Sequence, residues 1–310
     1  MLRIIAICNQ KGGVGKTTTA INLSAFLALS KKQVLLIDLD PQGNTTSGMG
    51  IDKTAVAKTS YHILLTPEEI NSSILSTWVE NLFLLPSNTD LIGAEVELVN
   101  EIDREFKLKN ALEKLSSDFD FILIDTPPSL GLLTLNALCS ANSVLIPMQC
   151  EYYALEGLGE LMTTIQMVQK SINKSLQIEG LILTMADFRT NLTQEVIKEV
   201  REFLPDKVYE TIIPRSVKLS EAPSFGKPIW FHDKHSTGAI KYKELSAEFL
   251  RRQEILQDQK KQPFSVEQES VSLPVLTLES QKPEPESKGE NLPVSQETNQ
   301  IFIIPPEGVI

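Results

Sequence analysis

The chain has 310 residues, of which 42% are hydrophobic and 22% are charged, and its formal net charge at pH 7 is −11. That length suits one large globular domain or two small ones, and the acidic total excludes a protein coated in basic surface, although not one with a local basic patch. Three unpaired cysteines, an N-terminus without a signal-peptide pattern and the lack of any apolar run near the roughly 20 residues of a membrane span lead us to expect a soluble cytoplasmic protein.

The first predicted element is a buried strand at residues 3–8, RIIAIC, which runs into a glycine-rich loop. The loop, KGGVGKTT at 11–18, matches the end of the phosphate-binding pattern G-x-x-x-x-G-K-[S/T]. The first glycine of that pattern is replaced by Gln10, and a second lysine, Lys11, stands beside it. A strand, this loop and a helix that opens at Lys16 form the arrangement in which a helix N-terminus binds phosphate. We therefore expect a nucleotide site with one lysine more than the usual pattern.

The residues of this loop each have an expected task in holding the nucleotide. Backbone N–H groups close around the phosphate oxygens, and glycine allows that close approach. The residues of this cradle are Gly12, Gly13, Val14 and Gly15. Lys16 would reach the β- and γ-phosphates, the Thr17 hydroxyl would ligate Mg²⁺, and Thr18 would hold the α-phosphate.

Two further predicted strands, 33–38 and 119–125, end on aspartates. Ligands of open α/β sheets bind at the carboxyl ends of the strands, so these acids are candidates for the same site. Asp125, after four apolar residues, is expected to hold Mg²⁺ through water. For Asp38, the sequence leaves open whether it binds a metal water or bonds the loop. Asp40 lies just past the strand end, where we expect it to orient the attacking water or to act as the general base.

The remainder of the body alternates between strand-like and helix-like patterns. Strands are predicted at 3–8, 33–38, 82–86, 119–125, 143–147, 180–184 and 208–212. Helices are predicted at 16–30, 94–115, 131–141, 155–170, 193–204 and 239–256. Several strands are continuous apolar runs, as expected when helices cover both faces of a sheet. The predicted fold class is α/β: a doubly wound, mainly parallel sheet flanked by helices, as in P-loop NTPases.

A change of composition near residue 257 divides the chain into a predicted P-loop domain at 1–257 and a tail at 258–310. The tail is rich in Pro, Glu, Gln and Ser. Such a mixture cannot bury enough apolar surface to offset its chain entropy, so we expect a disordered tail. Two apolar stretches interrupt it, SLPVLTL at 272–278 and IFII at 301–304, and these are either chance patches or short partner-binding segments.

The loop KGGVGKTT, with lysine at both places, has the form called a deviant Walker A motif, and further motifs accompany it. They are DLDPQGNTTSGMG (38–50), IDTPPSLGLLTLNAL (124–138), QCEYYALEGL (149–158) and IPRSVKLSEAPSFGKPI (213–229). Over about residues 1–255, this ordered set resembles the ParA/Soj-type chromosome partition ATPases of the ParA/MinD superfamily.

The resemblance implies a function and a set of partners. It implies an ATP hydrolase that uses ATP and Mg²⁺, forms an ATP-dependent homodimer and binds DNA without sequence preference. It also implies a ParB-like centromere-binding protein that stimulates hydrolysis, with chromosome or plasmid segregation as the outcome. Such a protein would be cytoplasmic and nucleoid-associated, and would not bind membranes.

The resemblance also implies a use for the second lysine. Lys11 would cross a dimer interface and touch the phosphates bound by the other subunit, so that it joins Lys16 and Asp40 as a catalytic residue. Two ATP molecules held face to face concentrate negative charge, which one lysine per site neutralises poorly. A lysine supplied by the partner would make dimerisation depend on the nucleotide.

Two further pairs of residues take roles from the family. Pro214 and Ser216 would border the nucleotide-base pocket, although relatives often carry Asn at the second position. Arg189 and Lys218 would contact DNA, although many relatives have Arg in place of the lysine. A lysine still neutralises a phosphate as a point charge, without the two-pronged hydrogen bonding of arginine.

Three alternative functions are weaker. A MinD-like ATPase that acts on the membrane surface would need a basic amphipathic C-terminal helix, whereas 301–310 has two prolines and no Lys or Arg. An electron-transfer ATPase with an iron–sulfur cluster would need two suitable cysteines, and Cys139 and Cys150 do not follow that pattern. A non-catalytic DNA-binding scaffold would not need the intact lysine, threonine and aspartates of the site.

Overall fold

The computed structural model describes residues 2–151 and 154–261. They fall within the first of two compact units, residues 1–272, whereas the second unit, 273–310, lies outside the described residues. The predicted tail is described only at its start, where a helix continues past residue 257 to Lys261. Both apolar stretches of the tail lie outside the described residues.

A seven-stranded sheet with the order β3-β4-β2-β5-β1-β6-β7 forms the centre of the described body. Its neighbours run parallel, except that the short edge strand β3 is antiparallel to β4. The strands are β1 (Arg3–Ile7), β2 (Val34–Asp38), β3 (Leu75–Ser76), β4 (Leu82–Leu85), β5 (Phe121–Asp125), β6 (Ser143–Gln149) and β7 (Gln177–Thr184). Since the chain starts on an inner strand and winds outward in both directions, the predicted doubly wound α/β sheet is confirmed.

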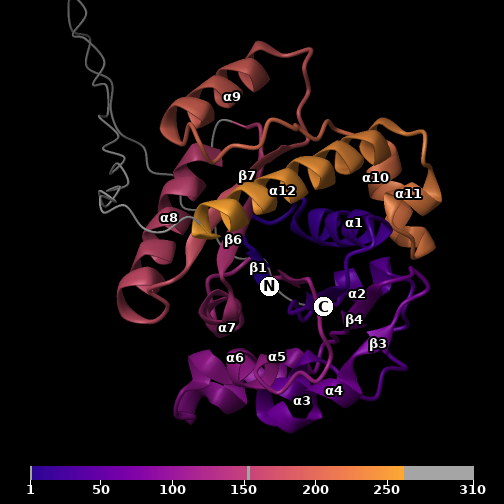
Figure 1. Ribbon diagram of the computed structural model, residues 1–310, viewed down its shortest axis with the longest axis vertical. Coiled ribbons are helices and arrows are strands. Elements are labelled where there is room, and N and C mark those ends of the chain that lie inside the picture. Colours follow the sequence, from indigo (N-terminus) through magenta and orange to yellow (C-terminus); the bar gives the residue numbers. More distant parts are fainter. Residues whose placement is uncertain (1, 152–153, 262–310) are drawn as a thin grey trace, which may run out of the picture. The chain divides into compact units, whose positions relative to one another are not determined.

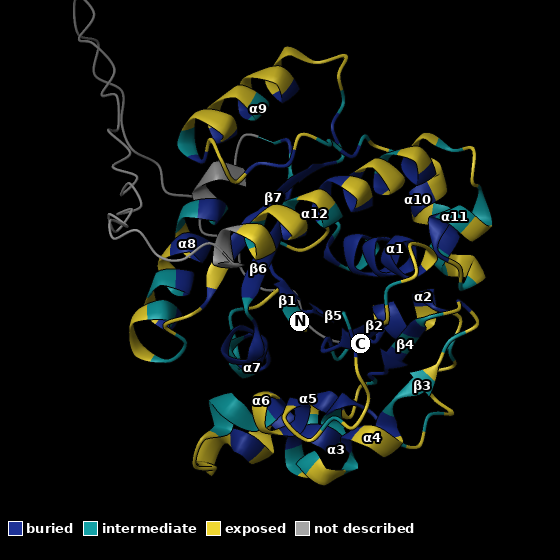
Figure 2. Ribbon diagram, in the orientation of Figure 1, coloured by how far each residue is buried: buried dark blue, intermediate teal, exposed yellow. Residues whose placement is uncertain are grey.

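Helices cover both faces of this sheet, with α1 and α12 on one side of the strands and α7 on the other (Figure 1). The α-helices are α1 (Lys16–Leu29), α2 (Asn44–Gly48), α3 (Ser60–Leu65), α4 (Ile70–Ser73), α5 (Leu91–Glu97), α6 (Lys107–Leu112), α7 (Leu132–Ser140), α8 (Ala154–Ser171), α9 (Asn191–Phe203), α10 (Val217–Glu221), α11 (Ile229–His232) and α12 (Thr237–Lys261). Short 3₁₀ turns are η1 (Pro67–Glu69), η2 (Leu98–Asn100), η3 (Arg104–Phe106) and η4 (Ala222–Phe225). Because both faces are covered, β2 and β5 are buried along their whole length (Figure 2), which explains their continuous apolar sequences.

The helix predicted at 94–115 is wrong as a single element. In its place α5 ends at Glu97, two 3₁₀ turns follow, and α6 begins at Lys107. Between the turns Asp103 takes a left-handed backbone conformation, with φ of 57°, which a right-handed helix cannot contain. Glu101, which ends the first turn, is extended with ψ of 138°, so the chain leaves the helical conformation at two nearby residues that no apolar period marks.

The strand predicted at 208–212 is also wrong. This segment joins the sheet only through an isolated parallel bridge between Val208 and Leu181. The N–H of Tyr209 still donates to the Leu181 carbonyl, but those of Glu210 and Thr211 donate to the Glu248 carboxylate on α12, at 2.8 and 2.9 Å. A side chain has taken the donors that a strand ladder would need, so the β-rich sequence does not form a strand.

The register of the sheet brings the predicted site residues together. The Cα atom of Asp38 at the end of β2 is paired with that of Asp125 at the end of β5, and Asp125 is paired on its other side with Ile7 of β1. The carboxyl ends of these three strands therefore meet where β1 enters the glycine loop.

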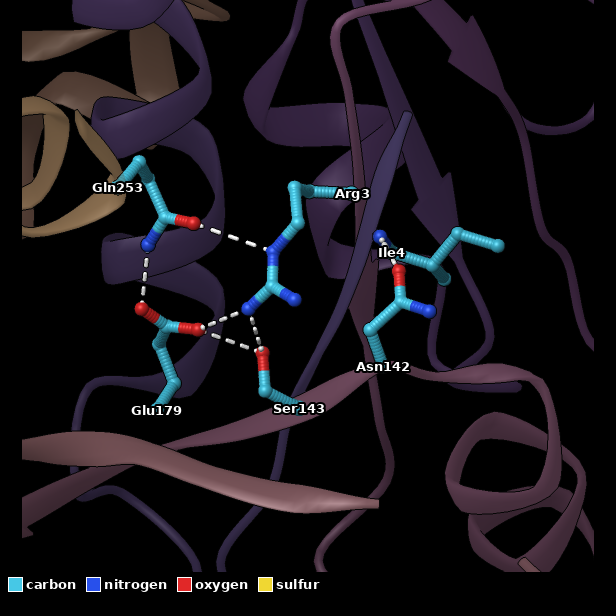
Figure 3. A network of polar contacts seen from close by, with 6 residues as sticks. All are labelled: Arg3, Ile4, Asn142, Ser143, Glu179 and Gln253. Atoms are coloured by element: carbon cyan, nitrogen blue, oxygen red, sulfur yellow. Dashed lines mark hydrogen bonds and ion pairs between the residues drawn. The ribbon is translucent and has the colours of Figure 1, made fainter. Parts of the chain in front are cut away.

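At the opposite end of the sheet, a polar network joins the starts of the strands to α12 (Figure 3). Arg3 of β1 donates from Nη2 to Glu179 Oε2 of β7 at 2.9 Å, and from Nε to Gln253 Oε1 of α12 at 3.1 Å. Glu179 also accepts from the hydroxyl of Ser143 at 2.6 Å and from Gln253 Nε2 at 2.5 Å. Because Glu179 and Gln253 are buried, this network ties the last helix to the amino end of the sheet.

Candidate active site

The glycine loop has a backbone that suits phosphate. Gly13 and Gly15 have φ values of 74° and 89°, which side chains other than glycine rarely adopt, so N–H groups can turn inward around an anion. The Lys16 ammonium is buried and donates to the carbonyl of Lys11 at 3.2 Å. Burial lowers the pKa of Lys16, while the nearby Asp125 opposes that shift. Since no carboxylate among the described residues forms an ion pair with Lys16, its charge is left for an anion.

Asp125 has the geometry of a residue that can hold a metal water. Its Oδ2 accepts from the hydroxyls of Thr17, at 2.8 Å, and Thr45, at 2.7 Å. Its Oδ1 is buried without a hydrogen-bond partner among the described residues. Burial raises the pKa of Asp125 to about 6, against the two hydroxyl hydrogen bonds that lower it. A carboxylate oxygen without a partner beside a threonine hydroxyl is a hard-oxygen pair that fits Mg²⁺.

The carboxylate of Asp38 is held entirely by protein groups. Its Oδ2 accepts from the N–H and the hydroxyl of Thr46, at 2.8 and 2.7 Å, and its Oδ1 accepts from the N–H of Asp40 at 3.2 Å. Burial and the neighbouring Asp125 raise its pKa to about 7. These contacts fit the second of the two roles that the sequence leaves open, in which Asp38 shapes the loop that leads into α2.

Asp40 lies beside the same site. Its carboxylate is buried and accepts from the N–H of Gln42 at 2.9 Å. The negative charge of Asp40 partly opposes the lowering of the Lys16 pKa by burial. The same charge adds to the raising of the Asp125 pKa. Asp40 therefore belongs to the same cluster of charged groups as Lys16 and Asp125.

The second lysine pairs with a carboxylate from a distant part of the chain. Lys11 Nζ forms an ion pair with Glu151 Oε2 at 2.8 Å, and both side chains are partly exposed. The neighbouring Gln10 donates to the carbonyl of Gly157 at 3.2 Å, near the start of α8. The outer rim of the loop is thus attached to the segment after β6 and faces outward.

A cavity of about 140 Å³ adjoins the loop on the side of α1. Pro214 and Ser216, the two predicted base contacts, line it together with the predicted α-phosphate residue Thr18. Thr184 and Met185 at the end of β7 line it as well. A larger hollow of about 620 Å³ beside Trp230 and the first part of α12 contains none of the predicted site residues, so the smaller cavity is the better candidate for the base.

The two predicted DNA contacts lie just before α9 and on α10. The side chains of Arg189 and Lys218 are 87% and 49% exposed, and both are paired with carboxylates of their own chain. Arg189 donates from Nε and Nη2 to Asp187, at 2.8 and 2.6 Å, which lowers the pKa of Asp187 to about 2. Lys218 Nζ lies 2.9 Å from Glu221 Oε2. A DNA phosphate would therefore have to compete with these carboxylates.

Several groups at the site are not among the sequence predictions. Thr45 on α2, Glu151 after β6 and Thr184 at the end of β7 each contact a predicted residue from a distant part of the chain. Thr45 lies inside the motif at 38–50, but no spacing rule marks it as a partner of Asp125. Thr184 donates to the carbonyl of Val14 at 2.8 Å, which only the folded sheet brings within reach.

Cys8, Cys139 and Cys150 are free and buried, and residues 2–151 and 154–261 contain no group of three or more His, Cys, Asp or Glu side chains placed to hold a metal ion. A magnesium ion carried by nucleotide phosphates needs fewer protein ligands than such a group provides. Within the same residues, no helix combines the length and apolar character needed to cross a membrane.

Known proteins share both the sequence and the fold of this chain. The family model described as an AAA domain matches residues 2–178. The chain is 56% identical over 248 residues to the sporulation initiation inhibitor protein Soj of Bacillus subtilis, covering 80% of this chain and 98% of that protein. It is 53% identical over 252 residues to the chromosome-partitioning ATPase Soj of Treponema pallidum, covering 81% and 98%.

Among solved structures, a similar one is the cobyrinic acid a,c-diamide synthase of Mycobacterium smegmatis, with bound ATP analogue and magnesium. The TM-score is 0.72 and the identity 38%, over 82% of this chain and 96% of that one.

Proposed function

This chain belongs to the ParA/Soj family of chromosome-partitioning ATPases, and from that membership we propose that it segregates chromosomal or plasmid DNA through an ATP-driven cycle of dimerisation and release. The protein is an ATP hydrolase. In the proposed cycle, ATP binding builds a sandwich homodimer, and the dimer binds DNA without sequence preference. A ParB-like centromere-binding partner then stimulates hydrolysis and release, which makes the protein nucleoid-associated in the cytoplasm.

The observation that carries the proposal is the position of Lys11. Its side chain is 39% exposed and its ammonium pairs with Glu151 at 2.8 Å. We expect a lysine that only neutralised the phosphates of its own subunit to be buried at the loop, as Lys16 is. An outward lysine beside the cradle suits contact with phosphates bound to a second subunit, where it would offset concentrated negative charge.

We assign the remaining loop residues to one ATP and one Mg²⁺. Lys16 and the N–H groups of 12–15 hold the phosphates, Thr18 holds the α-phosphate, and Thr17 supplies a hydroxyl to the metal. Asp125 supplies its free oxygen to a metal water, for which its buried Oδ1 without a partner is suited. Magnesium, when bound, neutralises charge on the phosphates.

Asp40 is assigned to the attacking water as its orienting group or general base. Asp38 is assigned to the same metal-side cluster, either through a metal water or by holding the loop, and its hydrogen bonds to Thr46 support the second role. Pro214 and Ser216 are assigned to the base, on the support of the cavity that they line with Thr18.

DNA binding is assigned to Arg189 and Lys218. One acidic monomer presents few cations to a polyanion, whereas a dimer presents both residues twice. In the free chain each is neutralised by a carboxylate, Asp187 or Glu221. The phosphates of DNA would displace these carboxylates, since they form a dense row of charge.

The domain assignment is also part of the proposal. The P-loop domain at 1–257 carries the ATPase, and the tail at 258–310 is an acidic appendage. The described helix α12 extends slightly beyond this boundary, to Lys261.

The proposal is tested by the size of the protein in ATP and in ADP, measured by light scattering. Wild type should be dimeric with ATP and monomeric with ADP, and Lys11→Ala should bind ATP but stay monomeric. Lys170→Ala, which removes an exposed lysine from α8, is the matched control and should dimerise normally. A normal ATP dimer of Lys11→Ala would show that this lysine has no role across an interface.

Binding to random duplex DNA at several salt concentrations tests the second step. Each neutralised phosphate contributes about −0.9 to the slope of log K against log salt, so removing one contact per subunit should flatten the slope of a dimer by about 2. Arg189→Ala and Lys218→Ala should show this change, and Lys174→Ala, at the opposite end of the sheet, should not. Equal DNA binding in ADP and in ATP would show that DNA binding does not depend on which nucleotide is bound.

A MinD-like role on membranes would instead be revealed by sedimentation with anionic liposomes.

A further inference from the structure

An aliphatic stripe lies exposed along α5 and the turns that follow it. Its members are Ile92, Val96, Val99 and Ile102, whose exposed fractions are 52%, 71%, 51% and 83%. The first three follow helical spacing and share one face, opposite the buried Leu91, Ala94 and Leu98 that anchor the helix. Because the anchoring face is already complete, the outward face contributes little to folding. Aliphatic side chains gathered in this way mark an interaction surface.

The surroundings of the stripe are strongly acidic. Between residues 90 and 107 the acids are Asp90, Glu95, Glu97, Glu101, Asp103 and Glu105, against only Arg104 and Lys107. The two cations are occupied within the segment, since Arg104 pairs with Glu105 and Lys107 with Glu101. The remaining acids, which include the exposed Asp103, give the stripe a negative border.

The stripe is connected to the ATP site by a short path. Glu95 Oε1 lies 2.9 Å from the position that a Cβ atom would take on Gly131, at the end of the loop that follows Asp125. In the same loop Pro128 lies against Gly12 of the phosphate cradle, 4.0 Å from the corresponding Cβ position. The loop therefore lies close to α5 at Gly131 and close to the cradle at Pro128.

A second contact links the segment to α7, which begins directly after that loop. The buried side chain of Asn136 on α7 accepts from the N–H of Leu108 at 3.0 Å and donates to the carbonyl of Arg104 at 2.9 Å. A displacement of the segment after α5 would therefore also shift α7 and the loop between Asp125 and Gly131.

We propose that the stripe formed by Ile92, Val96, Val99 and Ile102 is the docking surface for a basic amphipathic segment of a partner protein. The apolar side of that segment covers the aliphatic residues, and its Lys and Arg side chains face the acidic border. The partner thereby bears on α5, whose Glu95 lies beside Gly131 at the end of the loop that follows Asp125. The link to hydrolysis rests on the proposed function, whereas the docking itself does not.

The negative charge of the border disfavours a second copy of the chain, DNA and anionic lipid as binding partners of the stripe. A second copy of the chain, packed through the same surface by two-fold symmetry, would place one acidic border against another. DNA and anionic lipid would meet the same repulsion. A basic segment gains from both parts of the surface, since its apolar face is buried while its charges are complemented.

The test uses a fluorescent synthetic helix with Leu at i, i+4 and i+7 and Lys or Arg elsewhere, with binding measured by anisotropy. The wild-type chain should bind it, and the double variant Val96→Ser/Val99→Ser should bind about tenfold more weakly, because two aliphatic contacts are lost. Glu97→Gln/Asp103→Asn should weaken binding at low salt only. Ile255→Ser, on an equally exposed isoleucine of α12, is the matched control and should bind normally.

Two results would overturn the docking proposal: equal binding of a peptide with scrambled order, or unchanged affinity in the Val96→Ser/Val99→Ser variant. Circular dichroism checks that the variants are folded. Since anisotropy can be measured in ADP, it reports docking even if the proposed DNA cycle is wrong.

The coupling is tested with the ParB-like partner and the same double variant. The variant should keep its basal ATP turnover and lose stimulation by the partner. Stimulation equal to that of wild type would overturn the link between this surface and hydrolysis, and would leave the proposed partition function standing. Loss of stimulation together with normal peptide binding would also contradict it, because the surface would then act by another route.

Discussion

The two ends of the central sheet bury charge in opposite ways. At the amino ends, Arg3 and Glu179 form an ion pair at 2.9 Å, and Ser143 and Gln253 occupy further donors and acceptors of the pair. At the carboxyl ends, Lys16 has no carboxylate partner and one oxygen of Asp125 has no partner among the described residues. The amino end, with its charges paired within the protein, is called the closed end here. The carboxyl end, whose charges are available for a ligand, is called the open end.

Buried charges at the amino end stabilise the fold, whereas those at the carboxyl end are suited to binding a ligand. Removing one partner from a closed network leaves a buried charge without compensation, which is costly. At the open end burial has already disfavoured the charged forms, as the lowered pKa of Lys16 and the raised pKa of Asp125 indicate. Substitutions there should therefore change activity far more than stability.

The largest expected effect is at the closed end. Glu179→Ala leaves the Arg3 side chain, which is only 12% exposed, beside polar groups that cannot neutralise it, and should lower the free energy of unfolding by about 3 kcal/mol. The double variant Arg3→Met/Glu179→Leu replaces both charges and should recover most of this loss. Urea denaturation without nucleotide measures both. If the double variant is as unstable as the single one, the network contributes through packing and the comparison of the two ends is wrong.

The next effect is at the open end, where Lys16→Ala should abolish measurable ATP binding. Loss of a charged hydrogen-bond donor to the phosphates should weaken affinity at least roughly a hundredfold, equivalent to about 3 kcal/mol. The free energy of unfolding should stay within about 1 kcal/mol of wild type, because folding itself disfavours this charge. Calorimetric titration and urea denaturation give the two values. An unchanged affinity for ATP would show that Lys16 does not bind the phosphates. A large loss of stability would show that the two ends of the sheet do not differ in the way described.

Asp40→Ala should separate binding from chemistry. Loss of the group that orients water should slow ATP turnover by about 10²-fold or more, while affinity for ATP remains. Phosphate release and equilibrium nucleotide binding are the measurements. Asp52→Ala, which removes an exposed aspartate a short distance along the chain, is the control and should leave both unchanged. Near-normal turnover of the Asp40 variant would exclude it from the mechanism.

The smallest effect concerns an exposed pair on the functional side. Hydrogen bonds from Arg189 hold the pKa of Asp187 at about 2, below its ordinary value of 3.8. Because the folded pKa is depressed, the pair stabilises the protein above pH 3.8, and this contribution is lost as the pH falls toward 2. Arg189→Ala should return the pKa of Asp187 toward its ordinary value, with little change in stability near neutral pH, since the pair is exposed. Carboxyl NMR titration tests this, and an unchanged pKa would show that Arg189 is not its cause.

Prediction from sequence succeeded where a feature depends on local order. The glycine loop, its preceding strand and the aspartates that end β2 and β5 all lie where their motifs place them. It failed where a single conformation or a distant side chain intervened. Asp103 interrupts the helix expected at 94–115, and Glu248 takes the N–H groups of the strand expected at 208–212.

The sequence by itself determined the fold class, the phosphate loop and the family, because these follow from patterns within short stretches of chain. Only the tertiary structure decided which groups complete the site. Thr45 contacts Asp125, and Glu151 contacts Lys11, across long separations in sequence. It also decided that the aliphatic stripe of α5 faces outward. The physical reason is that such contacts, and the burial that shifts a pKa, depend on how distant elements pack, which no local pattern contains.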